Sequence, residues 1–147
     1  MAIPIRERLK LLQRVSADWL DLRRALHAIP AQRRATAPPD GWSARDIAIH
    51  VANWDEELTR VLLDLSEGLP ESWPPLSGPE RDAWNAQRLA EFAGLPVDDA
   101  LDYFEQAHFE LMELLEQSPY LSAELLKPAT DHYRQHAQSL RRRQPRR

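Results

Sequence analysis

The chain has 147 residues, of which 43% are hydrophobic, and it contains no cysteine. The length predicts a single domain with one hydrophobic core, and the missing thiols exclude disulfides, cysteine-ligated zinc and a cysteine nucleophile. The net charge is -4, but residues 1–140 alone carry 14 basic and 23 acidic residues, which makes nucleic acid an unfavourable principal ligand.

The composition of the chain is that of an all-α protein. It has only four glycines, and it is rich in leucine, alanine, glutamate and arginine. The hydrophobic spacing predicts a first helix over residues 5–27, followed by a loop over residues 31–41. The core-facing stripe of this helix is expected at Leu9, Leu12, Val15, Leu20 and Leu26, widened by Leu11 and Trp19.

A second helix is predicted over residues 43–66. Ser43 and Asp46 have the spacing of a capping box at its start, and Gly68 stops it. Residues 70–79 then contain four prolines and are expected to form a loop that lies over the core. The remaining helical segments are predicted at residues 79–92, at 98–117 with Asp98 as the cap, at 122–126 as a short turn, and at 128–142.

Together these segments predict a four-helix bundle with short extra helical turns. One domain is expected over residues 1–142, followed by a basic C-terminal tail over residues 143–147, which is interpreted as a solvated helix end. Four of the first ten residues are charged, and no apolar run approaches 18 residues. We therefore expect a cytoplasmic protein without membrane association.

Two histidines near the end of the chain have the spacing of a metal-binding pair. His132 and His136 are four residues apart, so on a helix both imidazoles lie on one face, about 6 Å apart along the axis. His50, on or beside the core-facing stripe of the second helix, is the candidate for a third ligand. Three neutral nitrogens would hold a divalent metal and leave a position open to water or substrate, as in catalytic sites.

The same histidines also permit a simpler interpretation. A His-x-x-x-His pair on an exposed face arises readily by chance, and a histidine beside a core is usually hydrogen-bonded and inert. His27 and His108 are both interpreted as structural residues. No phosphate-binding glycine loop, serine nucleophile elbow or His-Glu-x-x-His motif is present.

Three short motifs resemble one known superfamily. Residues 41–50, which include Trp42, Ser43 and His50, resemble the Trp-Ser and helix-His signature of the DinB/YfiT-like superfamily, and residues 131–136 resemble its closing His-x-x-x-His. Residues 81–86, with Asp82 and Asn85, resemble the Asp-x-x-Asn start of the third helix in its ClbS/DfsB branch. The resemblance extends over nearly the whole chain.

This resemblance implies a four-helix bundle in an up-down-down-up order, often a homodimer. It also implies that His50, His132 and His136 are the ligands of a divalent metal, usually zinc or nickel. Some members of the superfamily are thiol-dependent transferases or isomerases. The ClbS/DfsB branch includes a self-resistance protein that hydrolyses a reactive cyclopropane without depending on the metal.

Three hypotheses about function follow. The first is a metal-dependent hydrolase or thiol transferase that acts on a small electrophile, together with a low-molecular-weight thiol if transfer is the reaction. In this hypothesis Trp54 and Tyr133 are candidate pocket walls, and Asn53 and Asp131 are candidates for orienting the imidazoles. The second is a metal-independent protein for detoxification or stress resistance, with its pocket near Trp84 and Asn85. The third is a non-catalytic bundle braced by the metal.

Overall fold

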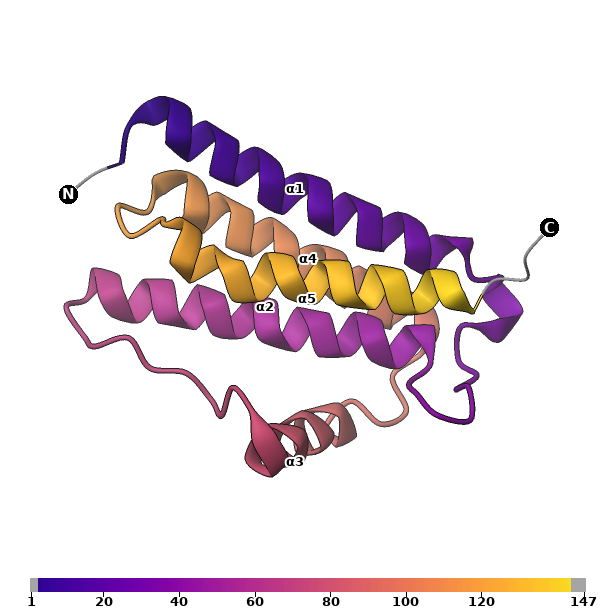
Figure 1. Ribbon diagram of the computed structural model, residues 1–147. Helices are drawn as coiled ribbons and strands as arrows, with labels where there is room; N and C mark the ends of the chain where they lie inside the picture. The colour runs from indigo at the N-terminus through magenta and orange to yellow at the C-terminus, as the bar shows by residue number, and fades with distance from the viewer. Residues whose placement is uncertain (1–2, 144–147) are drawn as a thin grey trace. The chain divides into compact units, whose positions relative to one another are not determined.

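A computed structural model describes residues 3–143 of the chain, and these residues form five α-helices and one short 3-10 helix, with no strand among them (Figure 1). The all-α fold class predicted from composition is therefore confirmed. The chain divides into two compact units. One contains the residues up to Ile47 and those from Pro119 onward, and the other is Ala48–Ser118.

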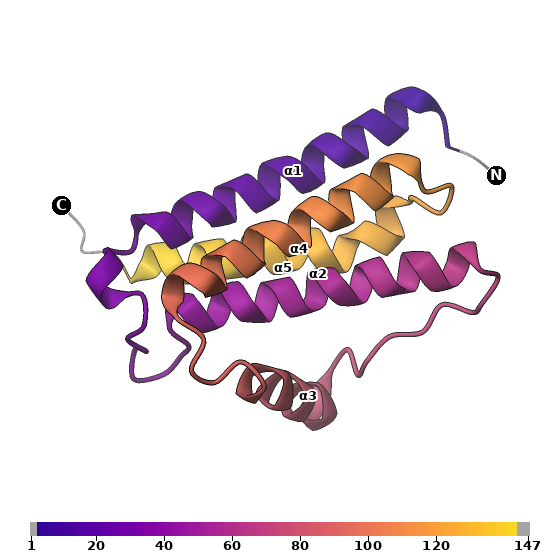
Figure 2. The ribbon, with the colours of Figure 1, turned by 180° about the vertical axis from the view of Figure 1, so that it is seen from behind.

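The first unit contains two long helices and a short one, namely α1 (Ile5–Ala28), η1 (Ala31–Arg33) and α5 (Ala123–Arg142). α1 and α5 lie side by side in both views (Figures 1 and 2). Both bury apolar side chains at helical spacing, so each presents one apolar stripe. The largest of these are Val15, Trp19, Leu22 and Leu26 on α1, and Leu125, Leu126, Tyr133 and Leu140 on α5.

The predicted stripe on α1 was wrong at two positions. Leu9 and Leu20 keep 52% and 43% of their surface exposed. The buried positions recur every three or four residues and include Trp19 and Leu22. Leu20 follows Trp19 directly, so it lies about 100° away from it around the helix. The buried stripe therefore keeps Val15, Trp19 and Leu26 of the expected set and includes Leu22, which was not expected.

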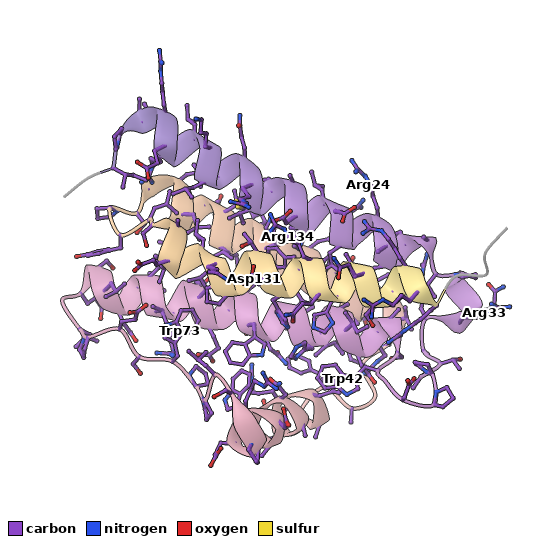
Figure 3. The ribbon with its side chains drawn as sticks, viewed as in Figure 1. Arg24, Arg33, Trp42, Trp73, Asp131 and Arg134 are labelled. Carbon is purple, nitrogen blue, oxygen red and sulfur yellow. The ribbon has the colours of Figure 1, made fainter. Side chains whose placement is uncertain are left out.

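Two ion pairs join α1 to α5 at the surface. The Nε atom of Arg134 lies 3.1 Å from Oδ2 of Asp18, and Arg141 is paired with Asp21. Figure 3 shows Arg134 extending from α5 toward α1. Pairs of this exposure contribute little to stability, so apolar packing rather than charge holds these helices together.

α2 (Ala44–Ser66) begins where the sequence predicts. The Oγ atom of Ser43 accepts the N–H of Asp46 at 3.0 Å, which satisfies one of the free donors of the first turn. The Asp46 carboxylate bonds Arg45 at 2.7 Å rather than completing a capping box. Beyond the helix, Gly68 adopts a φ of +80°, a conformation that glycine tolerates best.

The second unit contains most of α2 together with α3 (Gly78–Ala90) and α4 (Val97–Gln117). An extended segment over residues 67–77 runs back alongside α2 before α3 begins (Figures 1 and 2). Trp73 lies on this segment (Figure 3). α3 starts one residue before Pro79, close to the predicted start.

Two predicted helix starts were wrong. The N-cap of α4 is Pro96, and Asp98 lies inside the first turn, where its charge suits the positive end of the helix. The turn predicted at residues 122–126 and the helix predicted at 128–142 form one helix, α5, with Pro128 inside it. Ser122 caps this helix by accepting the N–H of Leu125 at 3.1 Å, so the helix begins before Pro128 and continues through it.

Part of the predicted tail is structured. Arg143 is the C-cap of α5 with helical backbone angles, and its guanidinium donates to the carbonyl oxygen of Trp42 at 2.5 Å. Residues 144–147 lie outside the described part of the chain. Within that part, no helix is long and apolar enough to cross a bilayer.

Candidate functional site

His132 and His136 lie on successive turns of α5, as their spacing predicts. Their Nε2 atoms are 3.0 Å apart and their ring centroids are 4.5 Å apart. Two nitrogens bound to one zinc ion, each about 2.0–2.1 Å from it, would lie about 3 Å apart or slightly more. The separation of the two imidazoles therefore fits two ligands of one ion.

His50 lies on α2 and keeps only 6% of its surface exposed. With His132 and His136 it makes a group in which each residue offers one ring nitrogen and these nitrogens lie within 4.8 Å of one another. The three histidines singled out in the sequence are therefore clustered. Their donor set, three imidazoles with no thiolate, suits zinc, nickel or iron equally and does not select among these metals.

The protonation state of His136 suits metal binding. Burial, and to a smaller extent the positive charge of Arg143, lower the pKa of His136 from its ordinary value of 6.5 to about 4. At neutral pH the imidazole is therefore uncharged, and no proton has to be displaced before the ring can bind a cation.

The candidate pocket residues Asn53, Trp54 and Asn85 all lie in the second unit. The indole N–H of Trp54 donates to Oδ1 of Asn85 at 2.9 Å, and its ring packs against Trp84 at a centroid distance of 4.7 Å. Asn53 is 1% exposed, and its Oδ1 accepts the hydroxyl of Tyr103 at 2.8 Å. These contacts connect α2 with α3 and α4.

Sequence reasoning missed two members of this polar cluster. Arg88 reaches Asn53 at 3.4 Å and pairs with Glu91 at 2.5 Å, while its guanidinium lies 5.9 Å from the ring centres of Trp84 and Phe92. Burial raises the pKa of Tyr103, and the charge of Glu56 raises it further. Single arginine and tyrosine residues are common on the surfaces of helices. No pattern in the sequence therefore distinguished Arg88 or Tyr103 from other surface residues.

Asp131 and Tyr133, the other two candidates, lie on α5. Asp131 is paired with Lys127 and lines a groove of about 440 Å³ between α1 and α5, together with Arg14 and Arg134 (Figure 3). Tyr133 is completely buried. Their roles in orienting ligands or lining a pocket remain predictions.

The two histidines interpreted as structural have different surroundings. His27 is exposed in the last turn of α1. His108 is 6% exposed, and its Nδ1 lies 3.7 Å from Oδ2 of Asp55, which is itself 2% exposed. A buried histidine beside a buried carboxylate fits the structural role expected for His108.

Charge is distributed unevenly along the chain. Residues 48–118 contain 3 basic and 16 acidic residues, whereas residues 1–47 and 119–147 contain 16 basic and 7 acidic residues. The acidic excess inferred from the whole sequence therefore belongs to the second unit alone. In the first unit several basic side chains extend outward, among them Arg24 and Arg33 (Figure 3).

Comparison with known proteins identifies the fold but not a close relative. No protein-family model and no curated protein sequence matches the chain. The structure is similar to the crystal structure of the colibactin self-resistance protein ClbS in complex with double-stranded DNA, with a TM-score of 0.76 and 11% sequence identity. The match covers 92% of this chain and 93% of the ClbS chain. The chain therefore has the DinB/YfiT-like helical-bundle fold of ClbS, as the sequence motifs suggested.

Proposed function

We propose that the chain binds one divalent metal ion through His50, His132 and His136 and acts as a metal-dependent enzyme on a small electrophilic molecule. The observation that carries the proposal is the grouping of three imidazole nitrogens within 4.8 Å. Three protein ligands leave at least one coordination position for water or substrate, which is typical of catalytic rather than structural sites. Zinc and nickel are the metals that the resemblance favours.

The chemistry available at such a site is hydrolysis or thiol transfer. A bound ion of this kind lowers the pKa of a water molecule or stabilises a thiolate at neutral pH. The contribution of the chain is to hold uncharged imidazoles in place: α5 spaces His132 and His136 by one turn, and the low pKa of His136 keeps that ring neutral. In the transfer reaction a low-molecular-weight thiol is the co-substrate.

The proposal is tested with an epoxide as the electrophile. Zinc-loaded chain is incubated with the epoxide, with and without cysteine as the thiol, and loss of the epoxide is followed by chromatography. We expect consumption by the wild type and by the His27→Ala control, which removes an exposed histidine. His132→Ala and metal-stripped protein should be inactive. Equal rates in His132→Ala and wild type would contradict a metal-dependent reaction.

A second candidate function is protection without use of the metal, as in a ClbS-like hydrolase or sequestering protein. The specific support is the buried polar cluster in which Trp54 donates to Asn85. Chelator-treated protein that remains folded and still consumes or retains a reactive metabolite would favour this candidate. Loss of that activity in Asn85→Ala, but not in His132→Ala, would assign it to the second unit.

This second candidate includes a partner, because ClbS was crystallised with double-stranded DNA. Lys10, Arg24 and Arg33 are exposed, and in the part of the chain that the structure describes none of their side chains makes an ion pair or hydrogen bond. Replacing all three by glutamine should weaken salt-dependent binding to a labelled 20-base-pair duplex. A control with the same net charge replaces the exposed Gln87, Gln106 and Gln117 by glutamate. Equal binding by the two variants would contradict a specific basic surface.

We also propose that the chain is a homodimer, as the resemblance implies, and that it is cytoplasmic, as expected from a sequence without cysteine. Sedimentation equilibrium of the purified chain tests the oligomeric state directly. A mass near twice the 17.0 kDa of one chain is expected, and a mass of one chain at micromolar concentration would contradict the dimer.

A further inference from the structure

Arg143 shares a face of α5 with two of the three clustered histidines. It follows His136 by seven residues and His132 by eleven, and its own φ of -83° and ψ of -10° continue the helical path. Seven residues complete almost two turns of an α-helix, so Arg143 lies nearly in line with His136 along the axis.

Two neighbouring residues fix the position of the guanidinium. Nη1 donates to the carbonyl oxygen of Trp42 at 2.5 Å, across 101 residues of sequence. A Cβ atom added to Gly41 would lie 3.1 Å from Nη2, so only a residue without a side chain leaves this space fully open. The side chain is half-buried, and the nearby charge of Asp40 supports its positive charge.

The hydrogen bond to Trp42 uses only some of the N–H donors of the Arg143 guanidinium. A guanidinium has five N–H donors in a rigid fork that matches carboxylate and phosphate oxygens. Among the described residues, the carbonyl of Trp42 is the one hydrogen-bond acceptor of this side chain. The remaining donors place a positive charge on the face of α5 that also carries His132 and His136.

We propose that Arg143 is a specificity-determining residue that binds an anionic group, a carboxylate or a phosphate, of the molecule that uses the metal site. This inference rests on the proposed three-histidine metal site and adds the chemical class of its substrate or thiol co-substrate. A bound divalent cation, neutral ligands and Arg143 together carry an excess of positive charge. A small organic anion neutralises that charge, and charge-assisted hydrogen bonds to guanidinium add to its affinity.

The test compares two thiols of nearly equal shape on cobalt-loaded protein. The first is 3-mercaptopropionate, which carries a carboxylate, and the second is 3-mercaptopropionamide, which is uncharged at that end. Binding of either thiolate to Co²⁺ is measured from the sulfur-to-cobalt charge-transfer absorption. We expect the wild type to bind the carboxylate about tenfold more tightly than the amide, which is the effect of one charge-assisted contact.

The variants assign this preference to Arg143. Arg143→Gln should bring the ratio of the two affinities close to one, and Arg143→Lys should keep an intermediate ratio. Arg142→Gln, which removes an exposed charge from the adjacent position, should keep the wild-type ratio. Gly41→Ala should lower the ratio without removing any charge, and it serves in place of Arg143→Gln if that variant does not fold.

The possible outcomes separate the two proposals. If the wild type takes up no Co²⁺, the three-histidine site is wrong and the assignment of Arg143 fails with it. If Co²⁺ binds but the wild type does not distinguish the two thiols, only the assignment of Arg143 is wrong. Retention of the full preference by Arg143→Gln overturns it in the same way.

Discussion

The Nε2 atoms of His132 and His136 lie 3.0 Å apart on successive turns of α5, with their rings at an angle of 75° to each other. Two imidazole nitrogens at this distance fit the coordination sphere of one metal ion. Arg143 follows on the same face of α5, so the candidate site would combine these metal ligands with the proposed anion-binding side chain.

The half-buried His136 should make the metal-free protein less stable in acid. Its pKa is 6.5 in the unfolded chain and about 4 in the folded one, so between these values the unfolded state binds the extra proton. Stability is therefore fully present above pH 6.5 and falls as the pH drops toward 4, by roughly 3 kcal/mol at most from this residue. Urea unfolding of metal-free protein at several pH values measures the slope.

His136→Gln provides the control for this pH dependence, because glutamine does not titrate. The variant should lose less stability than the wild type between pH 6.5 and pH 4. An identical slope in the two proteins would show that another group is responsible.

The cap of α2 should stabilise the helix that carries His50. Ser43→Ala removes the acceptor of the Asp46 N–H and should lower the free energy of unfolding by about 1 kcal/mol. Ser77→Ala is the matched control. Ser77 occupies the same position before α3, but its side chain makes no capping hydrogen bond there, so the change should be much smaller. Equal effects of both substitutions in urea unfolding would argue against the cap.

The hydrogen bond between Trp54 and Asn85 should contribute to the stability of the second unit. Trp54→Phe leaves the Asn85 oxygen without its donor in a position that is only 9% exposed, and should lower the free energy of unfolding by about 1–3 kcal/mol beyond the loss of packing. Trp73→Phe also removes an indole hydrogen bond, but one to the exposed Glu71. The Trp73 variant should therefore remain close to wild type. A larger loss in Trp73→Phe than in Trp54→Phe would contradict this account.

Much of the fold could be predicted from local sequence signals. Helical spacing and capping residues gave the start of α2 at Ser43 and the end of α4 at Gln117 within a residue or two. The prediction failed where packing overrides a local signal. A proline normally lies at the start of a helix or ends one, yet α5 continues through Pro128. Ser122 caps the helix six residues earlier, and the helix buries apolar side chains beyond the proline.

The site was predictable only where residue types and spacing carry chemical meaning. Histidines at a spacing of four residues are unusual enough to indicate a metal site, and the clustering of His50 with this pair agrees with that interpretation. Arg143 carried no such signal, because a run of arginines at the end of a helix normally indicates a solvated end. Its contact with Trp42 joins positions 101 residues apart, which no local pattern reveals.

Elemental analysis of untagged protein shows whether the three histidines bind a metal. After reconstitution with zinc at neutral pH and removal of the excess, the wild type and the His27→Ala control should retain about one divalent ion per chain. His50→Ala, prepared identically and shown to be folded by circular dichroism, should retain much less. A wild type without bound metal, or a folded His50→Ala variant with the wild-type content, would contradict the account.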